Sequence, residues 1–367
     1  MDFSFTAEQD DAAELAAKIL GDRVTTARHK AVEAAGDRFD RDLWRDLGEA
    51  GLLSLAVPEA YDGAGLGLIE LSRVLVEVGR TLAPVPLAVH GAAGLLLAQH
   101  ATPELQAAWL PGAATGATLL TAAVAEERSH LPQRPVVTAT ASGSAYSLSG
   151  TKAIVRAGAA ADAFLVTATA ADGVGVFLVE ARAPGVTAIA QRTSDGDTVV
   201  RLELDGAGGA LVGALDGEAA SALGQLLTVA SAAELLGITE GALKVTAEYA
   251  KTRHQFGRPI GTFQAVSQRL ADGFIDTLGQ RLMLWSAAWR LHEGLPAETE
   301  VAIAKLWAAD AAHRLAHTAV HVHGGVGIDL DGEVHRYFTT AKRFEFSFGG
   351  ATEQALSIGK ALAAEPA

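Results

Sequence analysis

The chain contains no cysteine among its 367 residues. This absence excludes disulfides, thiolate metal sites and a cysteine nucleophile, and it favours a cytoplasmic protein. Basic residues are also scarce, since 29 Lys and Arg face 43 Asp and Glu and give a net charge of −14. A general nucleic-acid-binding protein would carry a basic surface, so we expect no nucleic-acid partner. A local basic pocket for an anionic cofactor is compatible with this balance.

Long hydrophobic runs and a targeting segment are missing as well. No apolar run approaches the ~20 residues that span a bilayer, and the N-terminus M-D-F-S-F-T-A-E-Q-D-D lacks the basic start of a signal peptide. We therefore expect a cytoplasmic chain with no membrane span. Hydrophobic residues make up 49% of the sequence and charged residues 20%. This composition can form a sizeable buried core.

Hydrophobic periodicity divides the chain into three parts. Residues 1–116 have mostly helical spacing, residues 117–216 form short β-branched or alternating runs between Gly, Asp and Ser, and residues 217–367 form long Ala- and Leu-rich helical patterns. The sequence therefore predicts an α+β multidomain protein. Its parts would be an N-terminal helical domain, a small central antiparallel β domain and a C-terminal antiparallel helical bundle of the four-helix type.

The segment R-H-Q-F-G-R-P-I-G-T-F-Q, residues 253–264, joins two of the long helical patterns. Arg253 follows the first helix, a turn rich in glycine and proline comes next, and Phe263 and Gln264 open the second helix. An arginine held in place can bind a phosphate through two N–H donors. The N-terminus of the second helix adds backbone N–H groups and the positive end of its dipole. The pattern predicts an anion-binding junction, with a plain helix hairpin as the alternative.

A second group of polar residues lies at the end of the last long helical pattern and in the turn that follows it. Its histidines stand at helical spacing or next to it, at positions His313, His317, His321 and His323. Two histidines four residues apart could bind zinc, but the helix has no H-E-x-x-H glutamate, so we disfavour a metal site. The turn G-G-x-G that begins at Gly324 lets a backbone come close to a ligand.

Together these segments resemble the acyl-CoA dehydrogenase family. Two further stretches carry the resemblance: residues 42–70, with a P-E-x-x-x-G-x-G-x-G turn, and residues 148–168, with a G-x-K strand and a later Ala–Asp pair. The resemblance covers the whole chain and implies the same order of helices, β domain and bundle. It also implies a tetrameric, FAD-dependent enzyme that removes two hydrogens from the Cα–Cβ bond of an acyl-CoA.

The resemblance implies which residues contact the cofactor. In the family, the R-x-x-F motif, the Gln of F-Q and the G-G turn contact the ADP part of an FAD held mainly by the neighbouring subunit. The corresponding residues of this chain are Arg253, Gln255, Phe256, Gln264, His321, Val322, Gly324 and Gly325. His321 stands where a glutamine is usual, and either side chain can form a hydrogen bond.

The same resemblance shows no catalytic base. The family places a glutamate just before the last helix, where this chain has Gly349 and Gly350, or at the start of the bundle, where it has Leu227. Glu345 and Glu353 are the candidates for a relocated base. Each is displaced by about one helical turn, ~5 Å, which is more than proton transfer tolerates.

The positions that would contact the flavin ring also differ from the family. The T-E-P-x-x-G-S-D loop reads V-A-E-E-R-S-H-L-P-Q, with Ala125 in place of the threonine. The W-I-T/S stretch reads Ile154, Val155, Arg156, so a long charged side chain replaces a hydroxyl and would intrude on a flavin. Glu126 and Glu127 in the altered loop are expected to be solvated.

This combination is most similar to the non-catalytic β-type subunit of the actinobacterial α2β2 acyl-CoA dehydrogenases of sterol side-chain degradation. The resemblance implies a homologous catalytic partner subunit, an FAD shared across the interface, a steroid acyl-CoA substrate and an electron-transfer flavoprotein as acceptor. Three alternatives stay open: an active homotetramer with a relocated base, a flavin-dependent oxygenase of the same fold, and a binding protein without a cofactor.

Overall fold

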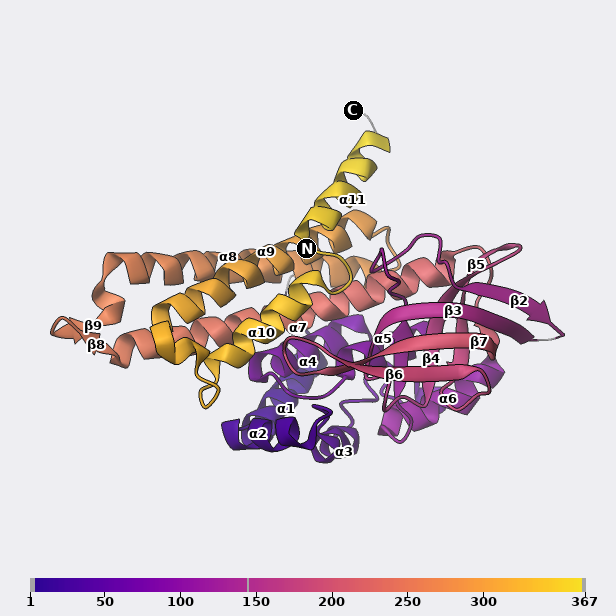
Figure 1. Cartoon of the computed structure of the whole chain (residues 1–367), viewed down its shortest axis with the longest axis horizontal. Coiled ribbons are helices and arrows are strands. Elements are labelled where there is room, and N and C mark those ends of the chain that lie inside the picture. The colour runs from indigo at the N-terminus through magenta and orange to yellow at the C-terminus, as the bar shows by residue number, and fades with distance from the viewer. Residues whose placement is uncertain (1–3, 144, 365–367) are drawn as a thin grey trace. The chain divides into compact units, whose positions relative to one another are not determined.

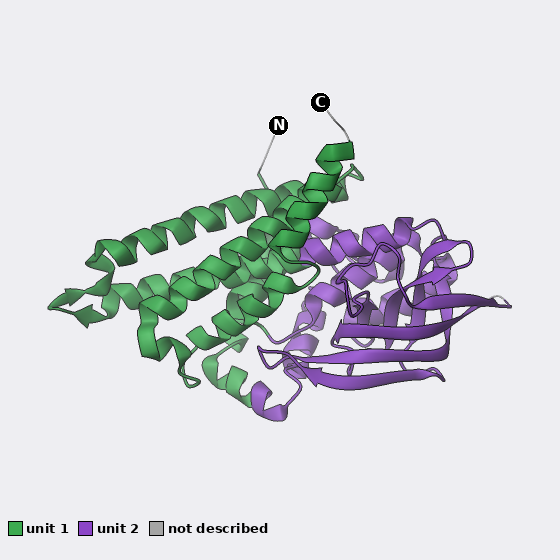
Figure 2. Ribbon diagram, turned by 45° about the horizontal axis from the view of Figure 1, so that its top comes forward, with its two compact units in different colours: residues 1–31, 72–83, 231–367 green, residues 32–71, 84–230 purple. Residues whose placement is uncertain are grey.

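The computed structural model describes residues 4–143 and 145–364 (Figure 1). Contacts divide the chain into two compact units (Figure 2). Unit 1 comprises residues 1–31, 72–83 and 231–367, and unit 2 comprises residues 32–71 and 84–230. These units group residues by contact, so the division into three domains by sequence stays a prediction.

Unit 2 is built around a seven-stranded sheet with the order β1-β4-β2-β3-β7-β5, in which β6 pairs with β7 and β4 also pairs with β5. The strands are β1 (Leu120–Ala123), β2 (Thr138–Ser142), β3 (Ala145–Arg156), β4 (Ala163–Ala170), β5 (Gly173–Glu180), β6 (Val186–Arg192) and β7 (Thr198–Val212). Most pairs are antiparallel, as predicted. β1 runs parallel to β4, and β2 meets β4 in one parallel pairing. Neither β1 and β4 nor β2 and β4 are consecutive in the chain, so no hairpin joins them and each pair can run parallel.

The sheet encloses the core of unit 2. Its fully buried side chains include Phe164 and Phe177 together with valines and leucines of β3, β4 and β7. The helices of this unit are η1 (Glu59–Tyr61), α3 (Arg41–Glu49), α5 (Leu87–His100) and α6 (Pro103–Thr115). Thr102 caps α6 by accepting a hydrogen bond from the Leu105 N–H, and Pro103 opens the first turn. A threonine cap followed by proline in the first turn is a common helix start.

Unit 1 is a bundle of long helices, as the C-terminal pattern predicts. Its helices and short strands are α1 (Ala7–Arg23), β8 (His254–Gln255), β9 (Arg258–Pro259), η2 (Ile260–Thr262), α8 (Gln264–His292), α9 (Glu298–His323), η3 (Gly324–Ile328), α10 (Val334–Phe346) and α11 (Ala351–Ala364). Buried alanines such as Ala304, Ala308 and Ala312 recur along α9 at helical spacing. Their small side chains let neighbouring helices approach closely.

Three helices have residues in both units: α2 (Thr26–Ala35), α4 (Leu68–Thr81) and α7 (Glu218–Thr252). Judged by length and composition alone, α7 could cross a membrane, with a mean hydropathy of 1.4 over 18 residues. However, 83% of that stretch is buried inside the protein. A core helix that is apolar on all sides has the same composition, so this is weak grounds for a membrane span.

Candidate functional site

The junction after α7 forms a short hairpin. The Arg253 N–H donates to the Tyr249 carbonyl, and the Arg253 carbonyl accepts from the Ile260 N–H, both at 2.8 Å. Between these bonds β8 pairs with β9, and the tip residues Phe256 and Gly257 have φ angles of 53° and 79°. Glycine adopts this conformation readily, whereas a phenylalanine in it is uncommon and strained. The Phe256 side chain is 92% exposed, so the hairpin presents an aromatic ring to its surroundings.

The start of α8 follows directly. Phe263 lies immediately before the helix, and the Arg258 guanidinium stacks on its ring at 4.3 Å. Gln264 is the first helical residue and is exposed. The backbone of Gly261 passes close to Ala250, which holds the hairpin against the end of α7. Sequence analysis predicted this turn and this helix start.

The turn after α9 lies at the same end of the bundle as the hairpin (Figure 1). The rings of Tyr249 on α7 and His323 on α9 stack with centroids 4.2 Å apart. The His323 Nδ1–H donates to the Ala319 carbonyl at 2.8 Å, and burial lowers the pKa of this imidazole. Gly324 ends α9 with φ 63° and ψ −139°, a conformation that essentially requires glycine. The structure thus brings the two predicted cofactor-binding segments together.

At this end of the bundle, several predicted cofactor residues have polar side chains available for a ligand. The side chains of Arg253, Gln264 and His321 are exposed, and none of them bonds another residue of the described ranges 4–143 and 145–364. Gln255 is also exposed, and its amide donates to the His254 carbonyl. Val322 is buried and supports the turn. The Arg253 cation, the amides of Gln255 and Gln264 and the open glycine turn suit an anionic phosphate group. Their role as FAD contacts stays a prediction.

The segment between α10 and α11 contains the positions where the family has its glutamate. Gly349 has φ 97°, and a Cβ atom there would lie 2.7 Å from Gln354 Nε2. Gly350 has ordinary backbone angles, and its nearest neighbour to a Cβ would be Phe346 at 3.4 Å. Only Gly350 could therefore accept a side chain without backbone strain. Leu227, the other family position, is an aliphatic side chain that is 1% exposed.

Both candidate replacements for the base have structural roles. The Glu345 carboxylate accepts from Lys342 Nζ at 2.5 Å and from His313 Nδ1 at 3.1 Å. Glu353 accepts from the Gly350 N–H at 2.8 Å and so caps the start of α11. These contacts fix the positions of both carboxylates relative to α10 and α11.

A buried lysine supports the same segment. Lys305 Nζ donates to the carbonyls of Phe344 and Glu345, each at 3.0 Å, at the end of α10. Burial lowers the pKa of Lys305 to about 7, although the charges of Glu345 and Glu353 oppose this shift. The Phe344 carbonyl also accepts from the Ser347 N–H at 3.2 Å, so the lysine adds a second donor there and supplies a donor to the helix-terminal Glu345 carbonyl.

The histidines on α9 contact other side chains of the bundle. The rings of His313 and His317 lie 4.7 Å apart, and His317 also packs edge-on against Phe338. Across residues 4–143 and 145–364, no three or more His, Cys, Asp and Glu side chains converge in a way that could hold a metal ion. Contacts of His313 with Glu345 and Lys342 account for its place in the fold.

The predicted flavin-ring positions lie within unit 2. Ala125 and Ile154 are neighbours in an antiparallel bridge, and Arg156 ends β3. Arg156 Nε lies 3.5 Å from the Asp197 carboxylate, and its Nη2 is within 3.5 Å of the Val85 carbonyl. These positions offer no side-chain hydroxyl, and the guanidinium is fixed by its own unit. That they do not hold a flavin ring stays a prediction.

The same region contains a second arginine–aspartate pair. Arg38 Nη1 lies 3.0 Å from the Asp195 carboxylate and donates to the Asp195 carbonyl at 2.8 Å. Both side chains are almost fully buried, at 7% and 1% exposed. The turn between β6 and β7 therefore carries two aspartates, and each is held by an arginine from another segment of unit 2.

The expectation that Glu126 is solvated was wrong. Its side chain is 8% exposed and accepts from Lys152 Nζ at 2.8 Å and from the N–H groups of Val136 and Val137. Burial alone would raise the pKa of Glu126, but these hydrogen bonds outweigh it and lower the pKa. Burial lowers the pKa of Lys152 to about 8. The lysine of the G-x-K strand could have predicted this ion pair, because a buried lysine needs a partner of opposite charge.

Comparison with known proteins agrees with this geometry. The acyl-CoA dehydrogenase N-terminal domain model matches residues 6–117, and the C-terminal domain model matches residues 227–363. The chain is 47% identical to acyl-CoA dehydrogenase FadE27 of Mycobacterium tuberculosis, over 100% of both chains. Its fold is similar to that in the ChsE4-ChsE5 complex of Mycobacterium tuberculosis, with TM-score 0.95, 46% identity and 100% of both chains covered. A variant of the Tcur3481-Tcur3483 steroid ACAD gives TM-score 0.94 and 40% identity over 97% of this chain and 98% of that one.

Proposed function

The chain belongs to the acyl-CoA dehydrogenase family, whose members are FAD-dependent oxidoreductases acting on CH–CH groups, and on this premise we propose that it is a non-catalytic subunit of a heteromeric acyl-CoA dehydrogenase. A homologous catalytic subunit supplies the flavin-ring pocket and the base. This chain supplies the hairpin at Arg253 and the turn at Gly324 to the ADP part of the partner's FAD. The two-component complexes of its relatives support this arrangement.

The observation that carries the proposal is the absence of any carboxylate at the base positions. Removal of an α-proton needs a carboxylate within hydrogen-bond reach. The family positions hold Gly349, Gly350 and Leu227, and the neighbouring Glu345 and Glu353 are engaged in ion pairs or in capping. No group of this chain at those positions is available to take the proton.

The contribution of this chain is binding and orientation. When bound, FAD accepts the hydride from the substrate. The Arg253 guanidinium would pair with phosphate oxygens through two N–H donors, while the amide of Gln264 and the imidazole of His321 would donate further hydrogen bonds. Phe256 would place its exposed ring against the partner. Each of these roles requires a side chain that is free in the isolated chain.

The substrate proposed for the complex is a steroid acyl-CoA thioester, because the relative Tcur3481-Tcur3483 is a steroid enzyme. The electron acceptor proposed is an electron-transfer flavoprotein, and the proposed location is the cytoplasm. In such a complex, the base, the flavin-ring pocket and the residues that contact the ADP part of FAD come together only at the interface between the two different subunits.

The test measures flavin absorbance per chain after expression of the chain alone and with its homologous partner. A colourless chain that acquires one FAD for every two chains in the complex is the expected result. Full flavin occupancy together with acyl-CoA oxidation by the chain alone would contradict the proposal and favour an active homotetramer. Full occupancy without acyl-CoA oxidation would favour a flavin oxygenase, and no flavin in either sample would favour a binding protein.

A further inference from the structure

The hairpin after α7 and the last turn of α9 contain three histidines whose rings are held differently. His323 is buried, its Nδ1–H donates to the Ala319 carbonyl at 2.8 Å, and burial lowers the pKa of the imidazole, so His323 stays neutral. His254 Nδ1 lies 3.0 Å from the Thr252 carbonyl, which fixes the ring proton on that nitrogen. His321 is exposed, and neither of its ring nitrogens bonds another residue in the part of the chain that the structure describes. Among the described histidines of this region, His321 is therefore the one with both nitrogens available to a ligand.

His321 lies beside open space and close to the predicted phosphate contacts. It stands one turn before Gly324, where an added Cβ atom would meet no atom from another part of the described chain within 4 Å. The His323 ring stacks on Tyr249, which precedes Arg253 by one turn at the end of α7. This stack joins the glycine turn to the Arg253 hairpin. An anionic ligand held by Arg253 therefore lies at the same end of the bundle as His321 (Figure 1).

We propose that His321 is a pH-dependent contact to the diphosphate of the partner's FAD. At mildly acidic pH it pairs with the diphosphate as a cation, and at mildly alkaline pH it offers a neutral hydrogen bond instead. The complex therefore holds FAD more tightly as the pH falls. This inference rests on the proposed function, because the ligand that it names is the ADP part of the partner's FAD.

The chemistry of the imidazole and the diphosphate determines the direction of this effect. Histidine is the side chain that ordinarily changes its charge between pH ~5 and ~8. An imidazolium donates charge-assisted hydrogen bonds to phosphate, and these are roughly twice as strong as neutral ones. The diphosphate of FAD is esterified at both ends and has no proton to lose in this window, so a change in affinity must come from protein groups. A glutamine at the same position would donate the same neutral hydrogen bond at every pH.

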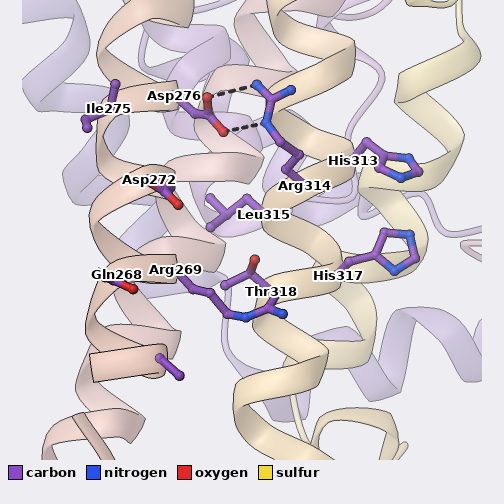
Figure 3. Close-up of a pocket in the computed structure, with 12 residues that line it drawn as sticks. Gln268, Arg269, Asp272, Ile275, Asp276, His313, Arg314, Leu315, His317 and Thr318 are labelled. Carbon is purple, nitrogen blue, oxygen red and sulfur yellow. Dashed lines mark hydrogen bonds and ion pairs between the residues drawn. The ribbon is translucent and has the colours of Figure 1, made fainter. Parts of the chain in front are cut away.

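The permanent cations around His321 are arginines of the hairpin and of the first turns of α8, namely Arg253, Arg258 and Arg269. Figure 3 shows Arg269 reaching from α8 to Thr318 on α9, one turn before His321. Arginine stays charged throughout the histidine window. These side chains therefore favour an anion at every pH, and they add no pH dependence of their own.

The carboxylates around His321 come from the end of α7, the turn after α9 and the residue before α10: Glu248, Asp329, Asp331 and Glu333. Glu248 is paired with Lys251 and Asp331 with Lys30, each at 2.6 Å. Carboxylates titrate near pH ~4, below the histidine window, so their charge is also constant. The side chains that titrate within the window are histidines on the same elements: His254, His317 and His335. A test must therefore distinguish His321 from these three.

The test measures the dissociation constant of FAD from the complex of the full chain with its homologous partner at pH ~6 and pH ~8, on either side of the ordinary titration of histidine. We expect the unchanged complex to bind FAD about fivefold more tightly at the lower pH, because a charge-assisted hydrogen bond replaces a neutral one. His321→Gln keeps a donor but takes up no proton, so its dissociation constant should be the same at both pH values. His317→Gln is the matched control, because His317 is an exposed histidine one turn earlier on α9, and it should keep the difference.

Equal affinity at both pH values in the unchanged complex would overturn the inference. A pH dependence that persists in His321→Gln would overturn it as well, and would assign the effect to another histidine such as His254. Loss of the pH dependence in His317→Gln too would show that the effect is not specific to His321. Gel filtration at both pH values checks that the subunits stay together, and thermal melting checks that both variants fold.

The proposed function would fail in a different way. Full flavin occupancy of the chain alone, or a complex without FAD at either pH, would refute the proposed function and remove the ligand of His321 with it. A complex that holds FAD with the same affinity at both pH values would refute the pH-dependent contact and leave the proposed function standing.

Discussion

The two regions that the family resemblance assigns to one cofactor differ in how their polar side chains are satisfied. At the end of the bundle in unit 1, Arg253, Gln264 and His321 are exposed and unbonded within the described ranges of the chain. In unit 2, Arg156 and Arg38 are held by aspartates of one turn. In the first region the polar side chains are open to a ligand, and in the second they are already satisfied by the chain itself.

This difference has an energetic basis. An exposed arginine is hydrated and costs little free energy until a ligand arrives, so it can be kept free. A buried arginine needs a partner, because an unpaired buried charge is strongly destabilising. Polar side chains that are buried and bind no cofactor must therefore pair with other groups of the chain. Polar side chains that bind a cofactor of a neighbouring subunit must stay exposed and unpaired until that subunit is present. Substitutions in the two units test that contrast, from the largest expected effect to the smallest.

The largest effect is expected from breaking the buried pair in unit 2. Asp195→Ala removes the carboxylate that faces Arg38, and we expect the free energy of unfolding to fall by ~3–5 kcal/mol. Urea denaturation measures the change. Glu203→Ala is the control, because its ion pair with Arg201 lies on the surface, at 40% and 48% exposed, and should change stability by less than about 1 kcal/mol. Similar losses in both variants would remove the distinction between this region and an ordinary surface.

The second effect concerns the buried lysine that supports the empty base position in unit 1. Lys305→Met removes the lysine donor from the Phe344 and Glu345 carbonyls, of which Phe344 keeps the Ser347 N–H, and we expect the free energy of unfolding to fall by about 1–3 kcal/mol. Lys342→Met is the control, since Lys342 is less buried and contacts side chains alone. A loss in the control as large as in Lys305→Met would show that burial at α10 is not the cause.

The pH dependence of Lys305 gives a separate signature. The pKa of Lys305 is lowered to about 7 in the folded protein, while an unfolded lysine titrates near about 10.4. Between these values the unfolded state binds more protons, so stability rises as pH rises. Urea titrations at several pH values in that window should show a smaller rise in Lys305→Met than in the unchanged chain. Lys152, with a pKa of about 8, accounts for part of the rise that persists. If the free energy of unfolding depended on pH in the same way in both proteins, Lys305 would be charged in the folded state.

The third effect tests the open region directly. Arg253→Ala should weaken FAD retention by the complex about tenfold, since one charge-assisted pair to a phosphate is lost. Stability should change by less than about 0.5 kcal/mol, because the side chain is exposed. Lys251→Ala removes a cation two residues away, which pairs with Glu248, and should leave FAD retention unchanged. Equal retention in Arg253→Ala and the unchanged chain would count against the cofactor role of Arg253.

Local features of the fold were predictable from sequence, and contacts between distant segments were not. Period and punctuation placed the helical regions, the β region and the start of α8, because these depend on neighbouring residues. Glu126 was misjudged because its partner Lys152 lies 26 residues away on another strand. The contact of Glu345 with His313 joins residues 32 positions apart, and the sequence pattern did not predict it either.

The local structure of the two predicted cofactor segments was predictable to the same extent, while their cofactor role stays a prediction. The hairpin at Arg253 and the turn at Gly324 follow from glycine and helix-start signals, and the structure places both segments as predicted. Their meeting through the stacked rings of Tyr249 and His323 depends on packing between helices, which a periodic pattern does not encode. The pairing of Arg156 with Asp197 also arises only when a strand end and a remote turn come together.

The smallest effect is expected from restoring the missing carboxylate. Gly350→Glu should be tolerated, because its backbone angles suit any residue and its surroundings leave room for a Cβ atom. Gly349→Glu should lower stability by about 1 kcal/mol more, because Gly349 has φ 97°. Neither variant of the chain alone should oxidise an acyl-CoA, since under the proposed function the partner subunit holds the flavin ring and a base added to this chain has no flavin to work with. Acyl-CoA oxidation by Gly350→Glu, measured with an artificial electron acceptor, would show that this chain holds its own flavin and that only the base had been lost.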